Sequence, residues 1–388
     1  MLEGEKYITA ALVVAGGRGE RAGGAVAKQY QSLAGIPVLR HALLAFCHHP
    51  AIAAVAAVIG AADQALYAAA AQGLDLLPPI IGGDSRQQSV LHGLRGLADL
   101  GPDCVLIHDG ARPFISGQVI DNVLAGLADH EGAIAAVAVV DSLKRGAAGL
   151  ITDEVSRDGL WQAQTPQGFT YGAILAAHES AGTGHTDDAS IARAAGMEIE
   201  IVAGSPDNGK ITTADDLARA DAAHAARLFD VRVGQGFDVH RFEPGHQVRL
   251  CGVDIPHDAQ LAGHSDADVA LHAVTDAILG AIGDGDIGRH FPPSESEWAD
   301  ADSARFVTFA VARLHDLGGR LAHLDLTIIC ERPKIAPHHQ LMAARLADIA
   351  GLEQTRVSIK ATTTERLGFT GRNEGIAAQA TATVRLPL

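Results

Sequence analysis

The sequence predicts two domains of different fold class, an α/β domain followed by an α+β domain, and three observations lead to this expectation. The 388 residues exceed what one hydrophobic core usually serves, and 47% of them are hydrophobic, which is enough for two cores. Short apolar runs alternate with alanine-rich stretches at helical spacing from Tyr7 to about Gly204. A different pattern begins at Val231, and no internal repeat relates the two halves.

The first domain is expected to be a mostly parallel sheet covered by helices. Its apolar runs occupy residues 10–14, 55–59, 105–107 and 133–140. Runs that are apolar on both faces suit strands buried between two layers of helices. Their alternation with helical stretches is typical of βαβ units.

The junction between the domains is expected after an alanine-rich helix that begins near Thr213 and continues to about Phe229. Thr213 fits the N-cap, because two acids follow it in the first turn. We therefore predict a first domain over residues 1–228 and a second over residues 229–388. Within the second domain, residues 324–329 and 357–361 are predicted strands.

Charge and composition exclude several classes of function. The formal net charge of −16 repels polyanions and no basic tract offsets it, so nucleic acid is not an expected partner. The longest mostly apolar stretch, residues 51–62, is shorter than the roughly 20 residues that cross a bilayer. The acidic N-terminus lacks the features of a secretory signal, and the four cysteines form no CxxC pair. We expect a soluble, cytoplasmic protein with no membrane partner, in which local cations bind small phosphorylated ligands.

A glycine-rich turn follows the first predicted strand, at residues 15–21. Its backbone N–H groups could hold phosphates, and Lys28 would add a mobile cation. Taken alone, such a turn is as often a tight connection in a parallel sheet. Further motifs in the same chain decide between these interpretations.

These motifs occur in a fixed order and together resemble the 2-C-methyl-D-erythritol 4-phosphate cytidylyltransferase family over residues 7–228. They are Gly82-Gly83-Asp84 with Ser89, residues 108–113 (HDGARP), residues 157–161 (RDGLW), Thr165-Pro166-Gln167, and residues 207–212 (DNGKIT). The resemblance implies a Rossmann-like nucleotidyltransferase sheet that binds CTP and Mg²⁺ at the carboxyl ends of its strands. In that reaction the substrate phosphate is the nucleophile, so positioning and charge neutralisation replace a general base.

The resemblance also implies roles for individual residues. Arg21 and Lys28 would hold the triphosphate and stabilise the pentacoordinate phosphorus. Cytosine would be surrounded by Ala15, Gly16, Gly83, Asp84 and Ser89, and Asp109 would hold the ribose and substrate region. Methylerythritol phosphate would be bound by Arg112, Ser142, Arg157, Thr165 and the catalytic Lys210, with Ser142 and Arg157 supplied by a dimer partner.

Four positions of this half depart from the family pattern. The loop opens with Val14-Ala15-Gly16-Gly17 where the family usually has Pro-Ala-Ala-Gly, and Ala27 replaces the proline before Lys28. Ser142 stands where threonine is common. None of these changes removes a charge or hydroxyl that the reaction requires, but the loop changes affect its rigidity.

In the second domain, Asp238 and His240 lie two residues apart in a predicted strand, so their side chains project from the same face. Alone, this spacing is more often a hydrogen-bonded surface pair. His272, on a predicted helix that follows residues 264–268 (HSDAD), could add a third ligand. Two imidazoles and a carboxylate are typical of a catalytic zinc site with one open position.

Five segments of this half resemble the 2-C-methyl-D-erythritol 2,4-cyclodiphosphate synthase family over residues 231–386. They are residues 236–240 (GFDVH), 264–266 (HSD), 285–288 (GDIG), 332–334 (RPK), and 360–365 (KATTTE) with 369–372 (FTGR). The resemblance implies an α+β subunit that forms a trimer, with active sites between neighbouring subunits and an apolar cavity at the centre.

Carried onto this chain, the resemblance assigns Zn²⁺ to Asp238, His240 and His272, and Mg²⁺ to Glu365. His264 and Ser265 would hold phosphate, and Asp286 would bind the erythritol hydroxyls. The diphosphate and cytidine would be held by Lys334, Thr362 and the catalytic Thr363. Phe369 and Arg372 match the mouth of the central cavity, where an isoprenoid phosphate could bind. Pro293 replaces an acid that would contact the ribose.

Two alternatives stay open at this point. The first half could act on another sugar or alditol phosphate, because the glycine-rich loop is shared across its superfamily. One or both halves could instead be an inactive, trimeric, zinc-binding scaffold. A trimer at one end and dimer contacts at the other would permit a hexamer. Since a kinase acts between the two reactions and no segment here resembles one, a separate kinase is a further expected partner.

Overall fold

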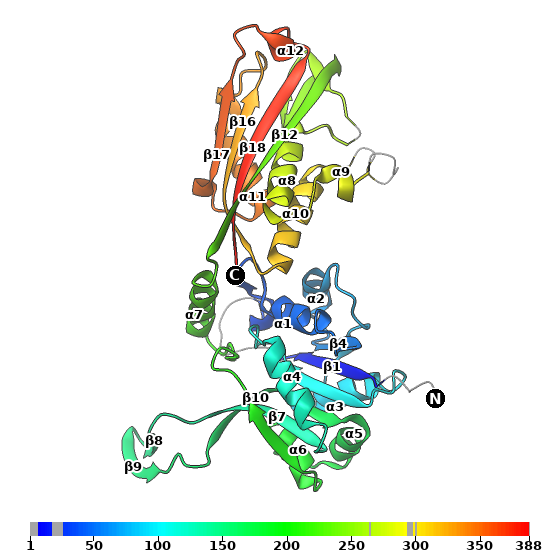
Figure 1. Ribbon diagram of the computed structural model, residues 1–388, viewed down its shortest axis with the longest axis vertical. Helices are drawn as coiled ribbons and strands as arrows, with labels where there is room; N and C mark the ends of the chain where they lie inside the picture. Colours follow the sequence, from blue (N-terminus) through cyan, green and yellow to red (C-terminus); the bar gives the residue numbers. More distant parts are fainter. Residues whose placement is uncertain (1–6, 18–25, 264, 293–297, 299–300, 388) are drawn as a thin grey trace. The chain divides into compact units, whose positions relative to one another are not determined.

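The computed structural model describes residues 7–17, 26–263, 265–292, 298 and 301–387, which fall into two compact units, residues 1–221 and 222–388 (Figure 1). The first unit contains a seven-stranded sheet in the order β11-β7-β10-β6-β1-β4-β5. Its strands are β1 (Thr9–Ala15), β4 (Ala54–Ile59), β5 (Ile80–Ile81), β6 (Cys104–Asp109), β7 (Gly132–Ala138), β10 (Trp161–Thr170) and β11 (Ile199–Ala203). β1, β4 and β6 include the predicted runs 10–14, 55–59 and 105–107, and β7 covers residues 133–138 of the predicted run 133–140. Within the sheet β10 pairs antiparallel with β6 and β7, and the other pairings are parallel.

Helices pack on both faces of this sheet, because β1 sends alternate side chains into two separate cores. Ala11 and Val13 belong to a core with α1 (Val38–Cys47), α2 (Gln64–Ala71) and α4 (Gly117–Gly126). Ala10 and Leu12 belong to the opposite core, with α3 (Arg86–Gly96), α5 (Tyr171–Ser180) and α6 (Asp188–Ala194). This is the predicted layered α/β architecture.

Shorter elements complete the first unit. The 3-10 helix η2 (Lys28–Tyr30) leads into the small pair β2 (Ser32–Leu33) and β3 (Ile36–Pro37). The hairpin β8 (Leu143–Ala147) and β9 (Leu150–Val155) is inserted between β7 and β10 and projects from the sheet as an arm (Figure 1). Helix α7 (Ala214–Ala225) starts one residue after its predicted N-cap and ends four residues before Phe229.

The second unit is built on a five-stranded sheet in the order β15-β12-β18-β16-β17. Its strands are β12 (Asp230–Pro244), β15 (Ala259–Leu261), β16 (Arg320–Ile329), β17 (Val357–Thr362) and β18 (Gly375–Leu386), and β13 (Gln247–Leu250) pairs with β14 (Val253–Pro256). The core lies between this sheet and three helices, α8 (Val269–Ile282), α10 (Ala304–Asp316) and α11 (His339–Ala350). Short helical segments are α9 (Ile287–His290), η4 (Ala336–His338), η5 (Gln354–Arg356) and α12 (Gly368–Gly371).

The two faces of this second sheet differ in burial. Along β12, Gly234 and Gly236 are buried against the helices, whereas Val231, Val233 and Phe237 are 59%, 60% and 59% exposed. Exposed apolar side chains in a row on one face of a sheet are typical of an interaction surface. Among the described residues, no helix is long and apolar enough to cross a membrane.

Candidate active sites

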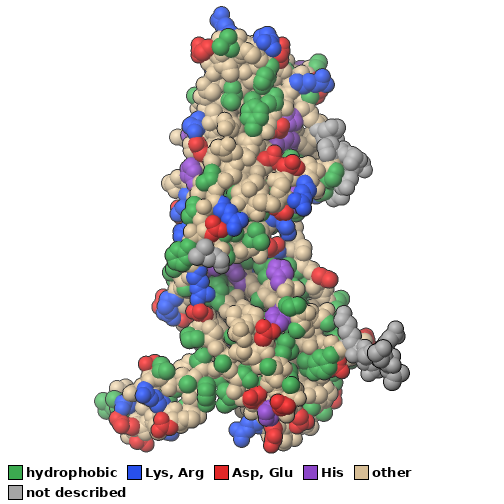
Figure 2. All heavy atoms as spheres, in the orientation of Figure 1, with side chains coloured by type: hydrophobic (Ala, Val, Ile, Leu, Met, Phe, Trp, Pro, Cys, Tyr) green, Lys and Arg blue, Asp and Glu red, His purple; other side chains and the backbone are tan. Residues whose placement is uncertain are grey.

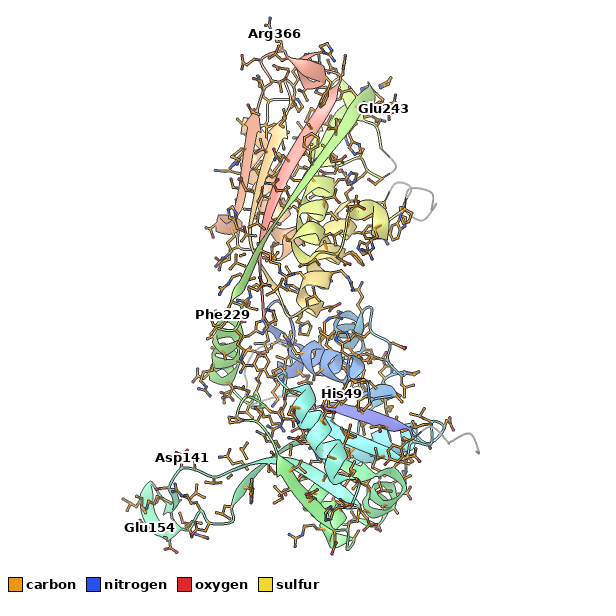
Figure 3. All side chains as sticks on the ribbon, viewed as in Figure 1. His49, Asp141, Glu154, Phe229, Glu243 and Arg366 are labelled. Atoms are coloured by element: carbon orange, nitrogen blue, oxygen red, sulfur yellow. The ribbon has the colours of Figure 1, made fainter. Side chains whose placement is uncertain are left out.

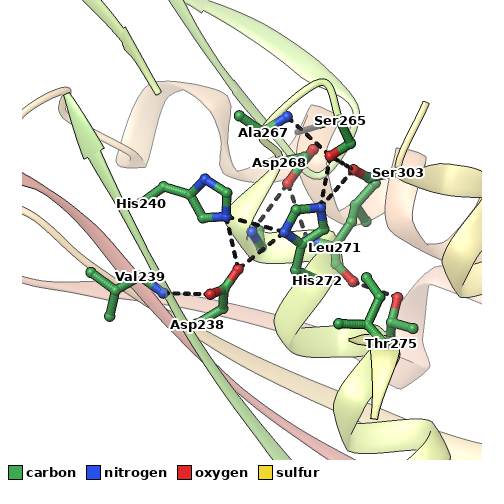
Figure 4. Close-up of polar contacts among 12 residues, drawn as sticks. Asp238, Val239, His240, Ser265, Ala267, Asp268, Leu271, His272, Thr275 and Ser303 are labelled. Carbon is green, nitrogen blue, oxygen red and sulfur yellow. Dashed lines mark hydrogen bonds and ion pairs between the residues drawn. The ribbon is translucent and has the colours of Figure 1, made fainter. Parts of the chain in front are cut away.

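Three side chains of the second unit meet where β12 and α8 come closest. Asp238 Oδ2 lies 3.0 Å from His240 Nε2 and 3.0 Å from His272 Nδ1, and the two imidazole nitrogens are 3.2 Å apart (Figure 4). In a tetrahedral zinc site with bonds of about 2.0 Å, neighbouring ligand atoms are about 3.3 Å apart. The three atoms therefore already have the spacing that a small tetrahedral ion requires. The predicted convergence of these residues is confirmed.

Close backbone packing makes this convergence possible. A β carbon added at Gly234 would lie 2.1 Å from the carbonyl oxygen of Ala277, and one added at Gly236 would lie 2.0 Å from that of Ala273. Only glycine allows the strand to approach the helix so closely. Helix α8 is in turn fixed at its start by Asp268, a fully buried residue whose carboxylate accepts from the N–H groups of Ala270 and Leu271.

Hydrogen bonds behind the three residues orient both imidazole rings. His240 Nδ1 lies 2.5 Å from the carbonyl oxygen of Ala262, so Nδ1 carries the proton and Nε2 presents its lone pair. His272 Nε2 lies 3.0 Å from the hydroxyls of both Ser265 and Ser303, which leaves Nδ1 as the ligand atom. Ser303 donates to Asp266 Oδ1 at 2.5 Å. Sequence reasoning gave no role to Ser303, which belongs to none of the motifs, or to Asp266, although Asp266 is the last residue of the HSD segment.

The charges of the site favour a cation. Burial alone would raise the pKa of Asp238, but its contacts with His240 and His272 outweigh burial and hold that pKa well below its usual range. Burial would lower the pKa of His240, yet the carboxylate of Asp238 raises it. A negative carboxylate next to two ring nitrogens is a donor set that matches a divalent ion of the zinc type.

In the first unit, a cluster of cations surrounds one carboxylate at the carboxyl end of β6. Lys210 Nζ donates to Asp109 Oδ2 at 2.8 Å, and Arg112 Nε lies 3.7 Å from the same oxygen. Arg86, which sequence reasoning missed, donates to Asp109 Oδ1 at 3.2 Å. Although burial opposes ionisation, these cations hold the pKa of Asp109 well below its usual range. Asp109, Arg112 and Lys210, three of the residues predicted to bind substrate, thus lie together.

A neutral histidine organises the side chain of Thr165 beside this carboxylate. Burial lowers the pKa of His108 to about 4, and its Nε2 lies 3.1 Å from the carbonyl oxygen of Arg112. His108 Nδ1 is therefore unprotonated and accepts from the Thr165 hydroxyl at 3.0 Å. The Thr165 oxygen in turn accepts from the N–H of Asp109 at 3.1 Å. Asn208 donates to the Thr165 carbonyl at 2.7 Å and so ties the loop before Lys210 to the same place.

The described start of the glycine-rich turn, residues 15–17, lies beside the segment of Gly83 and Ser89. A β carbon added at Gly16 would be 3.5 Å from Ser89 Oγ, and Ser89 accepts from the N–H of Gly83 at 3.1 Å. Gln29 fixes the start of this turn, because its side-chain amide donates to the carbonyl oxygens of Ala15 and Gly17 at 2.7 and 2.8 Å.

Comparisons with known proteins find relatives for both halves of the chain. The model of the family described as 2-C-methyl-D-erythritol 4-phosphate cytidylyltransferase matches residues 9–225, and that of the YgbB family matches residues 231–385. The bifunctional enzyme IspD/IspF of Rhodospirillum rubrum is 58% identical, over 97% of this chain and 99% of that protein. Its counterpart in Paramagnetospirillum magneticum is 56% identical, over 98% of this chain and 99% of that protein. The solved structure of bifunctional IspDF from Campylobacter jejuni is 27% identical, covers 98% of both chains and has a TM-score of 0.47.

The chain belongs to the bifunctional IspD/IspF family. It is therefore a bifunctional enzyme of isoprenoid biosynthesis, with a cytidylyltransferase followed by a cyclodiphosphate synthase. The first activity transfers CMP from CTP to 2-C-methyl-D-erythritol 4-phosphate. The second converts the phosphorylated cytidyl diphosphate into 2-C-methyl-D-erythritol 2,4-cyclodiphosphate and CMP. The predicted fold class, a nucleotidyltransferase sheet followed by an α+β synthase domain, is confirmed.

The remaining predicted residues of the cytidylyltransferase domain lie in two places. Lys28 donates from Nζ to the carbonyl oxygen of Ile211 at 2.8 Å, next to Lys210, and Asp84 is exposed beside Gly83. Ser142 and Arg157 are exposed residues of the arm and lie outside the cluster around Asp109. Figure 3 shows the arm between Asp141 at its base and Glu154 near its tip. Arg21 lies outside the described residues.

Within one chain, and apart from Ser265, the other predicted residues of the synthase domain that the structure describes make no hydrogen bond or ion pair with Asp238, His240 or His272. Backbone pairing places Val239 level with Ala377, Ile329 and Thr362 across the sheet. Thr362 is therefore three strands, about 14 Å, from the strand of Asp238 and His240. Thr363 donates to Glu365 Oε1 at 2.8 Å on the loop that follows. His264 and Pro293 lie outside the described residues.

Lys334 lines a pocket of about 710 Å³ together with Arg332 and Arg366. Arg366 lies at the same end of the sheet as Glu243 (Figure 3). Phe369 is 38% exposed, and Arg372 forms an ion pair of 2.8 Å with Glu374. Asp286 caps α9 by accepting from the N–H of Arg289 at 3.0 Å.

Proposed function

We propose that the synthase domain binds Zn²⁺ through Asp238, His240 and His272, and the spacing of their three ligand atoms is the observation that carries this proposal. A bound zinc ion would supply a Lewis acid that polarises a phosphate oxygen of the substrate. The chain's own residues fix the ring tautomers, and Ser265, whose hydroxyl lies 3.0 Å from His272 Nε2, would hold that phosphate. His264 and Asp286 would bind the rest of the substrate.

We infer that Glu365 holds Mg²⁺ at a site separate from the zinc site of the same chain. Mg²⁺ usually keeps several waters and binds through one or two carboxylates plus substrate phosphates, so a single exposed glutamate fits it. Thr363 orients this carboxylate through its hydroxyl. Lys334 and Thr362 would hold the diphosphate and cytidine, with the positive pocket of Lys334, Arg332 and Arg366 in support.

In the cytidylyltransferase domain, the cations around Asp109 support binding of two polyanions. Lys210 and Arg112 would bind methylerythritol phosphate, while Arg21 and Lys28 would hold the CTP phosphates with Mg²⁺. Because the substrate phosphate is already ionised, the task of these residues is to bring it to the α-phosphorus against charge repulsion. Cytosine would be held by Ala15, Gly16, Gly83, Asp84 and Ser89. Thr165, oriented by the neutral His108, would hold a substrate oxygen.

We propose that both domains take part in oligomers. The distance of three strands between the metal ligands and Thr362 supports active sites completed by a neighbouring subunit, and the exposed apolar row on β12 supports a trimer around that face. The arm carries Ser142 and Arg157 away from their own cluster, which supports a dimer in which each arm serves the other subunit. Figure 2 shows hydrophobic and charged side chains together at the tip of this arm. Together the two contacts would permit a hexamer.

We place the domain boundary between residues 228 and 229, close to the start of β12.

Further proposals concern the cellular location of the enzyme, a further ligand and a partner protein. The free cysteines and the nucleotide substrate support a cytoplasmic location. An isoprenoid phosphate would bind near Phe369 and Arg372. Native mass spectrometry of the purified oligomer tests whether such a ligand is bound. A separate kinase must act between the two reactions, and co-elution at cellular concentrations tests whether it associates.

Phosphorus NMR tests both activities and the site assignments in one design. The full chain is incubated with CTP, methylerythritol 4-phosphate and Mg²⁺, and separately with Zn²⁺, Mg²⁺ and the phosphorylated cytidyl diphosphate intermediate. Asp109→Asn should strongly slow only the first reaction, and Asp238→Asn should abolish only the second, so each variant is the folding control of the other. Metal analysis should find about one zinc per wild-type chain and none in Asp238→Asn. A wild-type zinc content near zero after metal-replete purification would refute the zinc assignment.

A further inference from the structure

A chain of charged side chains runs from Asp109 into the interior of the cytidylyltransferase domain. Arg86 donates from Nε to Asp109 Oδ1 at 3.2 Å and from Nη2 to Asp188 Oδ2 at 2.8 Å. Beyond it, His178 Nε2 lies 3.3 Å from Asp188 Oδ1, and the two side chains are 0% and 1% exposed. Arg86 thus joins a carboxylate of the site to one in the interior.

Helix starts fix both ends of this link. Arg86 is the first residue of α3, directly after the N-cap Ser85, whose hydroxyl accepts from the N–H of Gln88 at 3.1 Å. Asp188 is the first residue of α6, where Asp187 forms a capping box. A planar guanidinium held between two carboxylates sets the direction of both, because its N–H groups have fixed geometry.

The interior end of the link stays charged. Burial would raise the pKa of Asp188, but its contacts with His178 and Arg86 outweigh burial and lower it. An ionised, inaccessible carboxylate is a strong anchor, since leaving it without its partner in the interior is costly. Arg86 is therefore fixed on its interior side by Asp188, and its hydrogen bond to Asp109 is made to Oδ1. Lys210 and Arg112 meet the other oxygen, Oδ2, at 2.8 and 3.7 Å.

We propose that Arg86 is a positioning residue of the cytidylyltransferase site, which acts by holding Asp109 through one oxygen. Without the hydrogen bond from Arg86, the carboxylate of Asp109 can turn both oxygens toward Lys210 and Arg112. It would then neutralise the cations that must bind the substrate phosphate. Asp109, Asp188, Arg86, Arg112 and Lys210 carry formal charges that sum to +1, so the arrangement keeps a positive charge for an anion. The proposal rests on the roles proposed above for Asp109 and Lys210.

The test is a double-mutant cycle on kcat/KM of the cytidylyltransferase reaction in the full chain, with Arg86→Lys, Asp109→Asn and the double variant. Lysine keeps the charge but cannot span two carboxylates. We expect Arg86→Lys to lower kcat/KM at least about tenfold. The loss should come more from KM for methylerythritol phosphate than from KM for CTP. In the Asp109→Asn background, Arg86→Lys should lower kcat/KM by less than about twofold further. Radiolabelled CTP under single-turnover conditions keeps the slow variants measurable.

Arg95→Lys is the matched control, because Arg95 lies on the same helix and pairs with Glu179 of α5 at 3.0 Å on the surface. It should leave kcat/KM unchanged, and the synthase activity of every variant reports its concentration of intact chain. If Arg86→Lys does not give a folded first domain, Asp188→Asn replaces it, since it removes the anchor behind Arg86. Full activity of the variant, or an equal loss in both backgrounds, overturns the proposal. Asp109→Asn alone tests the proposed role of Asp109 separately, because that single variant contains an unchanged Arg86.

Discussion

Gly236 of β12 and Ala273 of α8 are packed so closely that a β carbon on the glycine would lie 2.0 Å from the alanine's carbonyl oxygen. Asp238 follows Gly236 by two residues on the same face of the strand, and His272 directly precedes Ala273. This contact therefore sets the distance between two of the three proposed zinc ligands. A change at Gly236 should act on the metal site although Gly236 binds no metal.

We expect Gly236→Ala to lower zinc affinity and synthase activity and to destabilise the synthase domain by about 1–3 kcal/mol, because overpacking must move α8 away from the strand. Zinc affinity is measured by chelator competition, and stability by calorimetry. Gly280→Ala, on helix α8 itself, is the control. The β carbon added there would lie 3.8 Å from its nearest neighbour, so it should not move the helix. Equal zinc affinity in Gly236→Ala and wild type would contradict the prediction.

Ser303→Ala should weaken zinc binding by about tenfold to a hundredfold, because it removes one of the two hydroxyls that orient His272. The same substitution at Thr308, whose hydroxyl bonds the carbonyl of Ala304 on the surface of α10, should have no effect on the metal. Zinc affinities of the two variants are compared at constant pH. Similar weakening in both would assign the loss to α10 as a whole.

The stability of the cytidylyltransferase domain should fall as pH decreases from about 6.5 to about 4. His108 is buried and neutral, with a pKa of about 4, whereas an unfolded histidine has a pKa of about 6.5. Between these values the unfolded state binds the additional proton, so stability rises with pH, by roughly 3 kcal/mol across the window. His108→Asn should lose this component and keep the bond from Thr165. Calorimetric stability curves of both proteins that run parallel from pH 4 to 7 would contradict the prediction.

Arg157 of one subunit and Lys210 of its dimer partner should act in one active site, as proposed above. Arg157→Ala and Lys210→Ala are each expected to lose cytidylyltransferase activity. Mixing the two variants under conditions of subunit exchange should restore activity in about one quarter of the sites, because each mixed dimer has one intact site. Mass spectrometry confirms that mixed dimers have formed. If they form without any gain in activity, Arg157 does not serve the neighbouring subunit.

Several features of this protein followed from sequence alone. The strands around residues 10–14 and 55–59 were predictable, because parallel strands buried on both faces must be apolar throughout. Asp238 and His240 were predictable as a pair, since alternate residues of a strand share a face. His272 was expected to join them from its motif, and the order of short motifs was enough to assign both enzyme families.

Other features required the tertiary structure, because they depend on residues distant in sequence that meet through packing. Arg86 and Asp188 are 102 residues apart and belong to no motif that predicts their contact. Ser303 reaches His272 from the start of α10, and the closeness of α8, which carries His272, to β12 depends on Gly236. The sequence determined which residues carry the chemistry, since residue type and local spacing are local properties. Only the tertiary structure decided which side chains hold them in place, because that depends on how helices pack against the sheet.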